Sequence, residues 1–70
     1  MFNREHIMYL TEREKEILEM VVTGLSNQQI SDRLSITIRT VKFHTSNIYA
    51  KLGVRSRIEV ILLAKNLIDD

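Results

Sequence analysis

Positive charge is concentrated in the middle of the chain, where no acidic residue occurs. Residues 33–58 hold six cationic side chains: Arg33, Arg39, Lys42, Lys51, Arg55 and Arg57. Residues 1–32 have six acids against three bases, net −3, and residues 59–70 have three acids against one base, net −2. A basic segment between acidic ends is typical of a surface that binds a polyanion. The alternative interpretation is an ordinary solvated run of charge.

Residues for other kinds of chemistry are missing or scattered. The chain has no cysteine, and its two histidines, His6 and His44, are far apart without a nearby carboxylate cluster. We find no nucleophile–base pair, paired carboxylates or glycine-rich phosphate loop, so we expect neither an enzyme nor a cofactor or metal site. No signal peptide is recognisable, and no run reaches the roughly 20 apolar residues of a membrane span. The sequence therefore predicts a cytoplasmic protein without membrane contact.

The elements that must position the cationic residues are predicted to be helices. Seventy residues allow a single domain, and the chain lacks proline and the alternation typical of strands. Helices are expected after Thr11, Ser26 and Ser56, because each has Glu or Gln three residues later, the spacing of a capping box. The two glycines of the chain, at positions 24 and 53, suit the ends of the first and third helices.

A short helix, a tight turn and a longer basic helix are predicted in the centre of the chain. The short helix begins after Ser26 and has about two turns, too few for stability alone in water. Residues 35–37 form the turn, and Thr37 is the expected N-cap of the longer helix, Ile38–Leu52. Ser31 is small, as a residue at a close helix crossing should be. This order is the helix-turn-helix pattern.

The longer helix has two unlike faces when its residues are placed at about 100° each. The core face is formed by residues that recur at helical spacing: Val41, Thr45, Ile48 and Leu52. The outer face and its edges hold small, polar or cationic residues with one large aromatic: Arg39, Thr40, Lys42, Phe43, Ser46, Asn47 and Ala50. His44 lies at the margin of the core, where a structural role is expected.

The outer face suits the major groove of DNA. Arginine and lysine can read guanine edges there, and apolar groups can contact a thymine methyl. Lys51, Arg55 and Arg57 are expected near the phosphate backbone, to which Thr40, Ser46 and Asn47 could also donate. For Phe43, the alternative is a side chain folded back over a neighbour.

Three segments resemble one known family in order and spacing. LTEREKEIL, GLSNQQI and ITIRTVKFHTSNIYAKLGVRSR together resemble the LuxR/GerE-type DNA-binding domain of bacterial transcription regulators, over about Leu10 to Ile68. The resemblance implies an all-α fold of four helices, winged-helix-like without the wing, whose third helix reads the major groove. It implies that Lys42 contacts a base or phosphate, that Ser46 faces the groove and that Thr40 contacts a phosphate. Ser31 replaces the usual alanine, and Phe43 is bulkier than the usual residue.

The fourth helix, expected from Ser56 to about Leu67, is apolar around most of its circumference. Six of the seven residues from 58 to 64 are apolar, and a 70-residue monomer has too little protein to cover them all. The family pattern places Val60, Ile61 and Ala64 inward. We therefore predict a twofold homodimer through Ile58 and Leu62, with Leu63 at its rim. The alternative is a tolerated exposed patch.

These features predict a regulator that binds double-stranded DNA by sequence, with residues 10–68 as the DNA-binding domain and residues 1–9 as an N-terminal extension. RNA polymerase is a further expected partner. One alternative is a protein-interaction module of the same fold, such as an anti-activator or adaptor that docks through the acidic first helix. Another is the promoter-reading region 4 of a sigma factor, against which the KLGVRSR segment and the apolar fourth helix argue.

Overall fold

The computed structural model describes four helices and the turns between them. It covers residues 9–69, with side chains described for residues 9–63, so most of the predicted N-terminal extension and the side chain of Ala64 lie outside the described part. The helices are α2 (Glu12–Val22), α3 (Asn27–Leu34), α4 (Ile38–Leu52) and α5 (Arg57–Asp69). No strand occurs in residues 9–69, which confirms the all-α class, and α5 ends two residues beyond the prediction.

Side-chain hydroxyl groups cap the helices at the three positions that the capping-box spacing predicted. Thr11 and Ser26 form complete capping boxes with Glu14 and Gln29, in which each side chain bonds the backbone N–H of the other residue. The predicted box at Ser56 is only half formed. Its hydroxyl accepts from the Glu59 N–H at 3.2 Å, but the Glu59 carboxylate accepts from the N–H of Arg55 instead.

Three helices end with a residue in the left-handed region. Gly24 has φ +98° and Gly53 has φ +71°, and each is followed by a backbone bond that reaches back five residues, from Leu25 to Met20 and from Val54 to Tyr49. Ser35 ends α3 with φ +56°, although a side chain is normally disfavoured there. This strained residue stands in the turn between α3 and α4, and the sequence did not reveal it.

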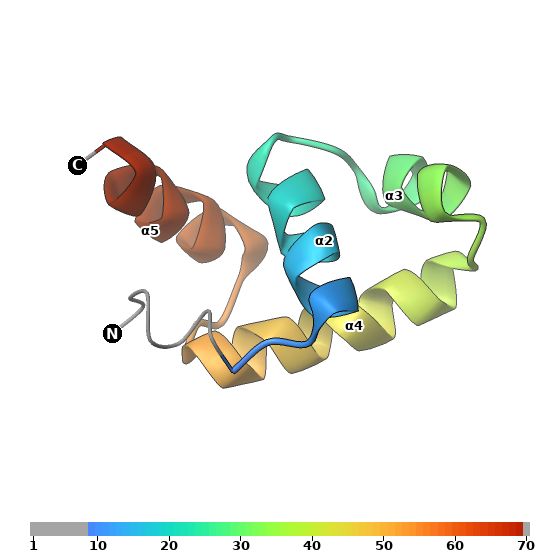
Figure 1. The fold of residues 1–70 in the computed structure, drawn as a ribbon, viewed down its shortest axis with the longest axis horizontal. Helices are drawn as coiled ribbons and strands as arrows, with labels where there is room; N and C mark the ends of the chain where they lie inside the picture. Colours follow the sequence, from blue (N-terminus) through green and yellow to red (C-terminus); the bar gives the residue numbers. More distant parts are fainter. Residues whose placement is uncertain (1–8, 70) are drawn as a thin grey trace.

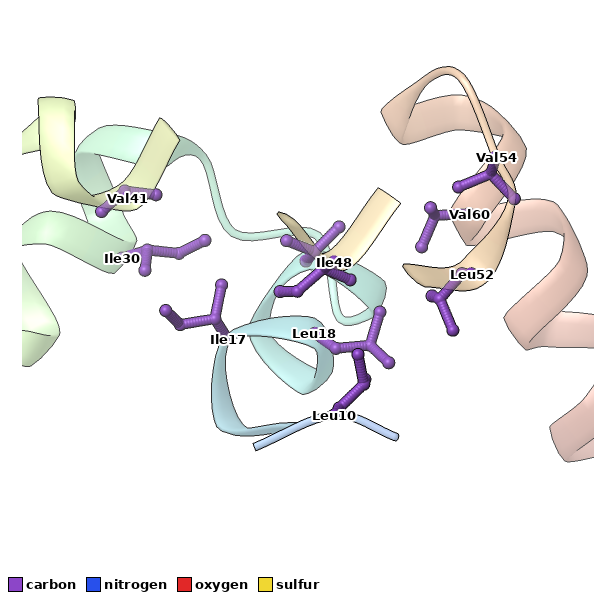
Figure 2. Packing of buried hydrophobic residues seen from close by; sticks show 10 residues of the cluster. Leu10, Ile17, Leu18, Ile30, Val41, Ile48, Leu52, Val54 and Val60 are labelled. Atoms are coloured by element: carbon purple, nitrogen blue, oxygen red, sulfur yellow. The ribbon is translucent and has the colours of Figure 1, made fainter. Parts of the chain in front are cut away.

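The hydrophobic core runs along the inner face of α4 (Figure 2). Ile30 of α3 and Ile17 of α2 lie near Val41, at the N-terminal end of α4. Leu18 and Leu10 lie near Ile48, and the far end of the core joins the residues Leu52, Val54 and Val60. Most of these side chains are fully buried, so α4 is held at every turn along its length.

The other three helices lie on one side of α4 (Figure 1). α2 crosses the middle of α4, α3 packs against the N-terminal half of α4, and α5 lies above the C-terminal half of α4. None of the described helices covers the opposite side of α4. The fold therefore presents one long helix face to solvent.

Candidate nucleic-acid interface

The two predicted faces of α4 are both present. The residues predicted for the core face are all buried: Val41, Thr45, Ile48 and Leu52. On the opposite side, the exposed residues are Arg39, Lys42, Phe43, Ser46 and Ala50, while Thr40 and Asn47 are half-buried at its edges. We call these seven residues the outer face of α4. It contains two cations, several hydrogen-bonding groups and no acid.

Phe43 stands at the centre of the outer face. Its ring meets the edge of His44, with ring centroids 5.7 Å apart, yet 63% of the residue remains exposed. The alternative prediction, in which Phe43 folds back over a neighbour, therefore applies only to this edge contact with His44. A large apolar group is left accessible among polar and cationic neighbours.

The turn before α4 is fixed by a reciprocal pair of bonds between Ser31 and Ile36. The buried Ser31 hydroxyl donates to the carbonyl of Ile36, and the N–H of Ile36 donates to the carbonyl of Ser31 at 3.1 Å. An alanine at position 31 could make only the second bond. The serine therefore adds a link between α3 and the start of α4, where Thr37 caps the helix and its hydroxyl lies 3.0 Å from that of Thr40.

Lys51 is paired inside the protein. Its Nζ donates to Oε1 of Glu14 at 2.7 Å, and the same oxygen accepts from the N–H of Thr11 at 2.8 Å. The Glu14 side chain is only 6% exposed, whereas that of Lys51 is 37% exposed. Burial acts to raise the pKa of the Glu14 carboxyl, but the bonds from Lys51 and Thr11 outweigh it and leave the pKa below its ordinary value.

Arg57 also has partners within the chain. Its Nη1 donates to Oδ1 of Asn27 at 3.0 Å, and its Nη2 donates to the carbonyl of Leu25. Burial raises the pKa of the nearby Tyr49 phenol, and the positive charge of Arg57 opposes this rise. Arg55, in contrast, is exposed and has no side-chain partner among the described residues. Of the three cations predicted to lie near phosphates, only Arg55 is unpaired in this part of the chain.

The apolar residues of the described part of α5 differ in their exposure. Val60 is fully buried and Ile61 is half-buried. Ile58 and Leu62, four residues apart, are 71% and 58% exposed, whereas Leu63 is half-buried and packs against the core. Ile58 and Leu62 thus form an uncovered apolar stripe on the described part of α5.

Glu14, Asn27 and Leu25 accept hydrogen bonds from Lys51 and Arg57, a role that was not predicted for them. The capping spacing pointed to Glu14 as a helix-start residue, but nothing in the sequence joined it to a lysine 37 residues later.

Among the described residues, no group of three or more His, Cys, Asp or Glu side chains could hold a metal ion. No helix in that part of the chain is long and apolar enough to cross a membrane.

Comparison with known proteins agrees with this geometry. The chain is 46% identical over 63 residues to the Fimbriae Z protein of Escherichia coli (strain K12), which covers 90% of this chain and 30% of that protein. It is 51% identical over 55 residues to the response regulator protein VraR of Staphylococcus aureus (strain NCTC 8325), which covers 79% of this chain and 26% of VraR. The chain thus spans less than a third of the length of these relatives. Residues 8–64 match the family described as bacterial regulatory proteins, luxR family, to which this chain therefore belongs.

Proposed function

We propose that this chain binds double-stranded DNA by sequence and acts in transcription regulation, with α4 in the major groove. The observation that supports this most is the outer face of α4, which is exposed, cationic and free of acids on a helix fixed by its buried side. An α-helix fits the major groove, where lysine and arginine can bond to guanine. The family to which the chain belongs is one of regulatory proteins rather than a class of enzyme.

Individual roles follow from position on α4. Phe43, at the centre of the outer face, Ser46 beside it and Lys42 at its exposed edge would meet base edges, with Arg39 one turn earlier. Thr40 and Asn47, at the half-buried edges, would donate to phosphates. Exposed Arg55 would lie near the backbone beyond the end of α4.

The stripe of Ile58 and Leu62 supports a further proposal, that the protein binds DNA as a homodimer through α5 with Leu63 at the rim. The two exposed side chains face the same way, as a self-complementary twofold contact requires. Two copies of α4 would then read a palindromic site, since protein symmetry is mirrored in the operator. RNA polymerase remains a predicted partner of the regulator, and we assign no surface to it.

The acidic surface of α2 gives little support to a protein-interaction module in place of a DNA-binding domain. Glu16 pairs with Arg13 at 2.8 Å and Glu12 pairs with Lys15 at 3.6 Å, so much of the negative charge is balanced within the helix. The basic outer face of α4 has no such internal compensation among the described residues. We therefore retain DNA binding as the proposal.

Selection of bound sequences from a random pool of duplexes tests the function. We expect a palindromic consensus and an affinity that falls steeply as salt rises, because bound phosphates release counterions. With the selected duplex, Lys42→Ala should cost about 1–3 kcal/mol and relax specificity at one position, if Lys42 reads a base. An equal loss on all sequences would make Lys42 a phosphate contact. Failure to recover any duplex would refute DNA binding.

A further inference from the structure

Arg57 connects the first turn of α5 to the beginning of the helix-turn-helix. Its two acceptors, the side chain of Asn27 and the carbonyl of Leu25, are 30 and 32 residues away in sequence. Asn27 is the first residue of α3, and Leu25 lies in the loop between α2 and α3. One guanidinium group therefore spans from α5 to the segment that positions α3.

The extensive helix–helix contacts of the described chain do not include one between α5 and α3. α5 packs against α2, whereas α3 packs against α4, and in Figure 1 α3 and α5 extend to opposite sides of α2. The loop that Arg57 reaches is itself fixed at the end of α2, because the N–H of Leu25 donates to the carbonyl of Met20 at 3.0 Å. Holding α5 against this loop therefore also holds α5 in a fixed position relative to α2 and the helix-turn-helix of α3 and α4.

Arginine suits this position because of its shape. The planar guanidinium presents donors in a fixed fork, so that two acceptors of different elements are held at a defined angle. A lysine would keep the positive charge but could not reproduce both bonds. The next residue in the chain, Ile58, belongs to the exposed stripe of α5. The bonded residue and the proposed dimer contact are therefore adjacent in the first turn of the same helix.

We propose that Arg57 is a positioning residue that sets the angle between the dimer stripe of α5 and the outer face of α4, and that it does not contact DNA phosphates. In a dimer, this angle determines how far apart and in what rotation the two α4 helices are presented. Arg57 would then help to define the spacing between half-sites. The inference rests on the proposed function, because it requires DNA binding by a dimer through α5.

Duplexes with altered spacing test the proposal. The palindrome recovered by selection is compared with versions that carry one base pair more or fewer between the half-sites, which changes the distance between the half-sites by about 3.4 Å along the duplex. Binding is measured by fluorescence anisotropy. Arg57→Lys should lower the preference of the protein for the correct spacing by about threefold to tenfold, the range expected for one net hydrogen bond. Affinity for an isolated half-site should be unchanged.

Asn27→Ala is the second variant, because it removes an acceptor and leaves the arginine in place. We expect it to relax spacing in the same way, a result that a phosphate contact by Arg57 would not produce. A circular dichroism melt of each variant confirms that the helices are retained. If neither variant changes the spacing preference, the positioning role is wrong.

Salt dependence separates positioning from phosphate binding. The slope of log Kobs against log salt changes by about 0.9 for each phosphate that the protein no longer neutralises. Arg57→Gln should leave this slope unchanged on a half-site, whereas the control Arg55→Gln, at an exposed arginine two residues earlier, should reduce it by about that amount. An equal reduction by both variants would overturn the proposal. Failure of the wild-type protein to bind any duplex would instead refute the proposed function.

Discussion

The ion pair between Glu14 and Lys51 should contribute strongly to stability, although Lys51 was predicted to lie near DNA phosphates. Glu14→Gln removes the charge but keeps an oxygen that can still accept from the N–H of Thr11, so the helix cap is retained. Lys51 then loses its charged partner. The variant therefore isolates the contribution of the ion pair to the free energy of unfolding.

The expected magnitude follows from the geometry of the pair. Opposite charges 2.7 Å apart attract by about 6 kcal/mol at an effective dielectric constant of about 20, before the cost of removing both groups from water. Exposed pairs contribute about 0–1 kcal/mol, and breaking a fully buried pair costs about 3–5 kcal/mol. Because Glu14 is buried and Lys51 is partly exposed, we expect Glu14→Gln to cost about 2 kcal/mol. For a domain of this size, that loss lowers Tm by about 8–16 °C.

The effect should depend on pH. A carboxyl whose pKa is lower in the folded chain than in the unfolded chain stabilises the fold above about pH 4, and this contribution disappears as pH falls through the folded-state pKa. Thermal and urea unfolding by circular dichroism should therefore show the largest difference between wild type and Glu14→Gln near pH 7. The difference should shrink as the pH falls below about 4.

Glu16→Gln is the matched control on the same helix. Glu16 also pairs with a cation, Arg13, at 2.8 Å, but both side chains are about half exposed. Its loss should cost less than about 0.5 kcal/mol at pH 7. Equal effects of the two glutamine substitutions, or a Glu14→Gln effect that does not shrink as the pH falls below about 4, would refute the reasoning.

Three further predictions concern the ends of α3 and α4 and the outer face. Ser35→Gly should stabilise the protein by about 0.5 kcal/mol in urea unfolding, because glycine relieves the strain at φ +56° and this gain is partly offset by the greater flexibility of the unfolded chain. Gly53→Ala should destabilise the protein by about 1 kcal/mol, because alanine is strained at the positive φ of this position. A Ser35→Gly variant less stable than the wild type would contradict this reasoning. If Phe43 contacts a thymine methyl, replacing that thymine by deoxyuracil in the selected duplex should weaken binding about fourfold for the wild type and not at all for Phe43→Ala. The same weakening in both proteins would exclude that contact.

The fold was largely predictable because local signals mark its boundaries. Thr11, Ser26 and Thr37 begin helices through their own side chains, and glycines near the ends of α2 and α4 adopt the left-handed region, so residues within one turn carry the information. The end of α5 was less accurate, since residues 64–70 contain no glycine or proline that would mark it. Ser35 was missed because serine is not a typical residue for positive φ.

The outer face of α4 was predictable for a similar reason, since helical periodicity alone separates Val41 and Ile48 from Phe43. The hydrogen-bond partners of the cations outside the outer face could not be predicted in this way. Lys51 and Arg57 find their partners 37 and about 30 residues away, and such pairings exist only once the helices have packed. Charge in the sequence indicated a basic surface but could not show which cations are used within the protein.

The anchoring of α4 by one face only has a consequence for how such a regulator can evolve. Val41, Ile48 and Leu52 are almost completely buried, whereas Arg39 and Phe43 bury little. Substitutions at these exposed positions should change stability by no more than about 0.5 kcal/mol. If α4 reads DNA as proposed, mutations that alter the preferred DNA sequence can therefore accumulate without a loss of folding, and gene duplication could give each copy a new target site while the scaffold is retained.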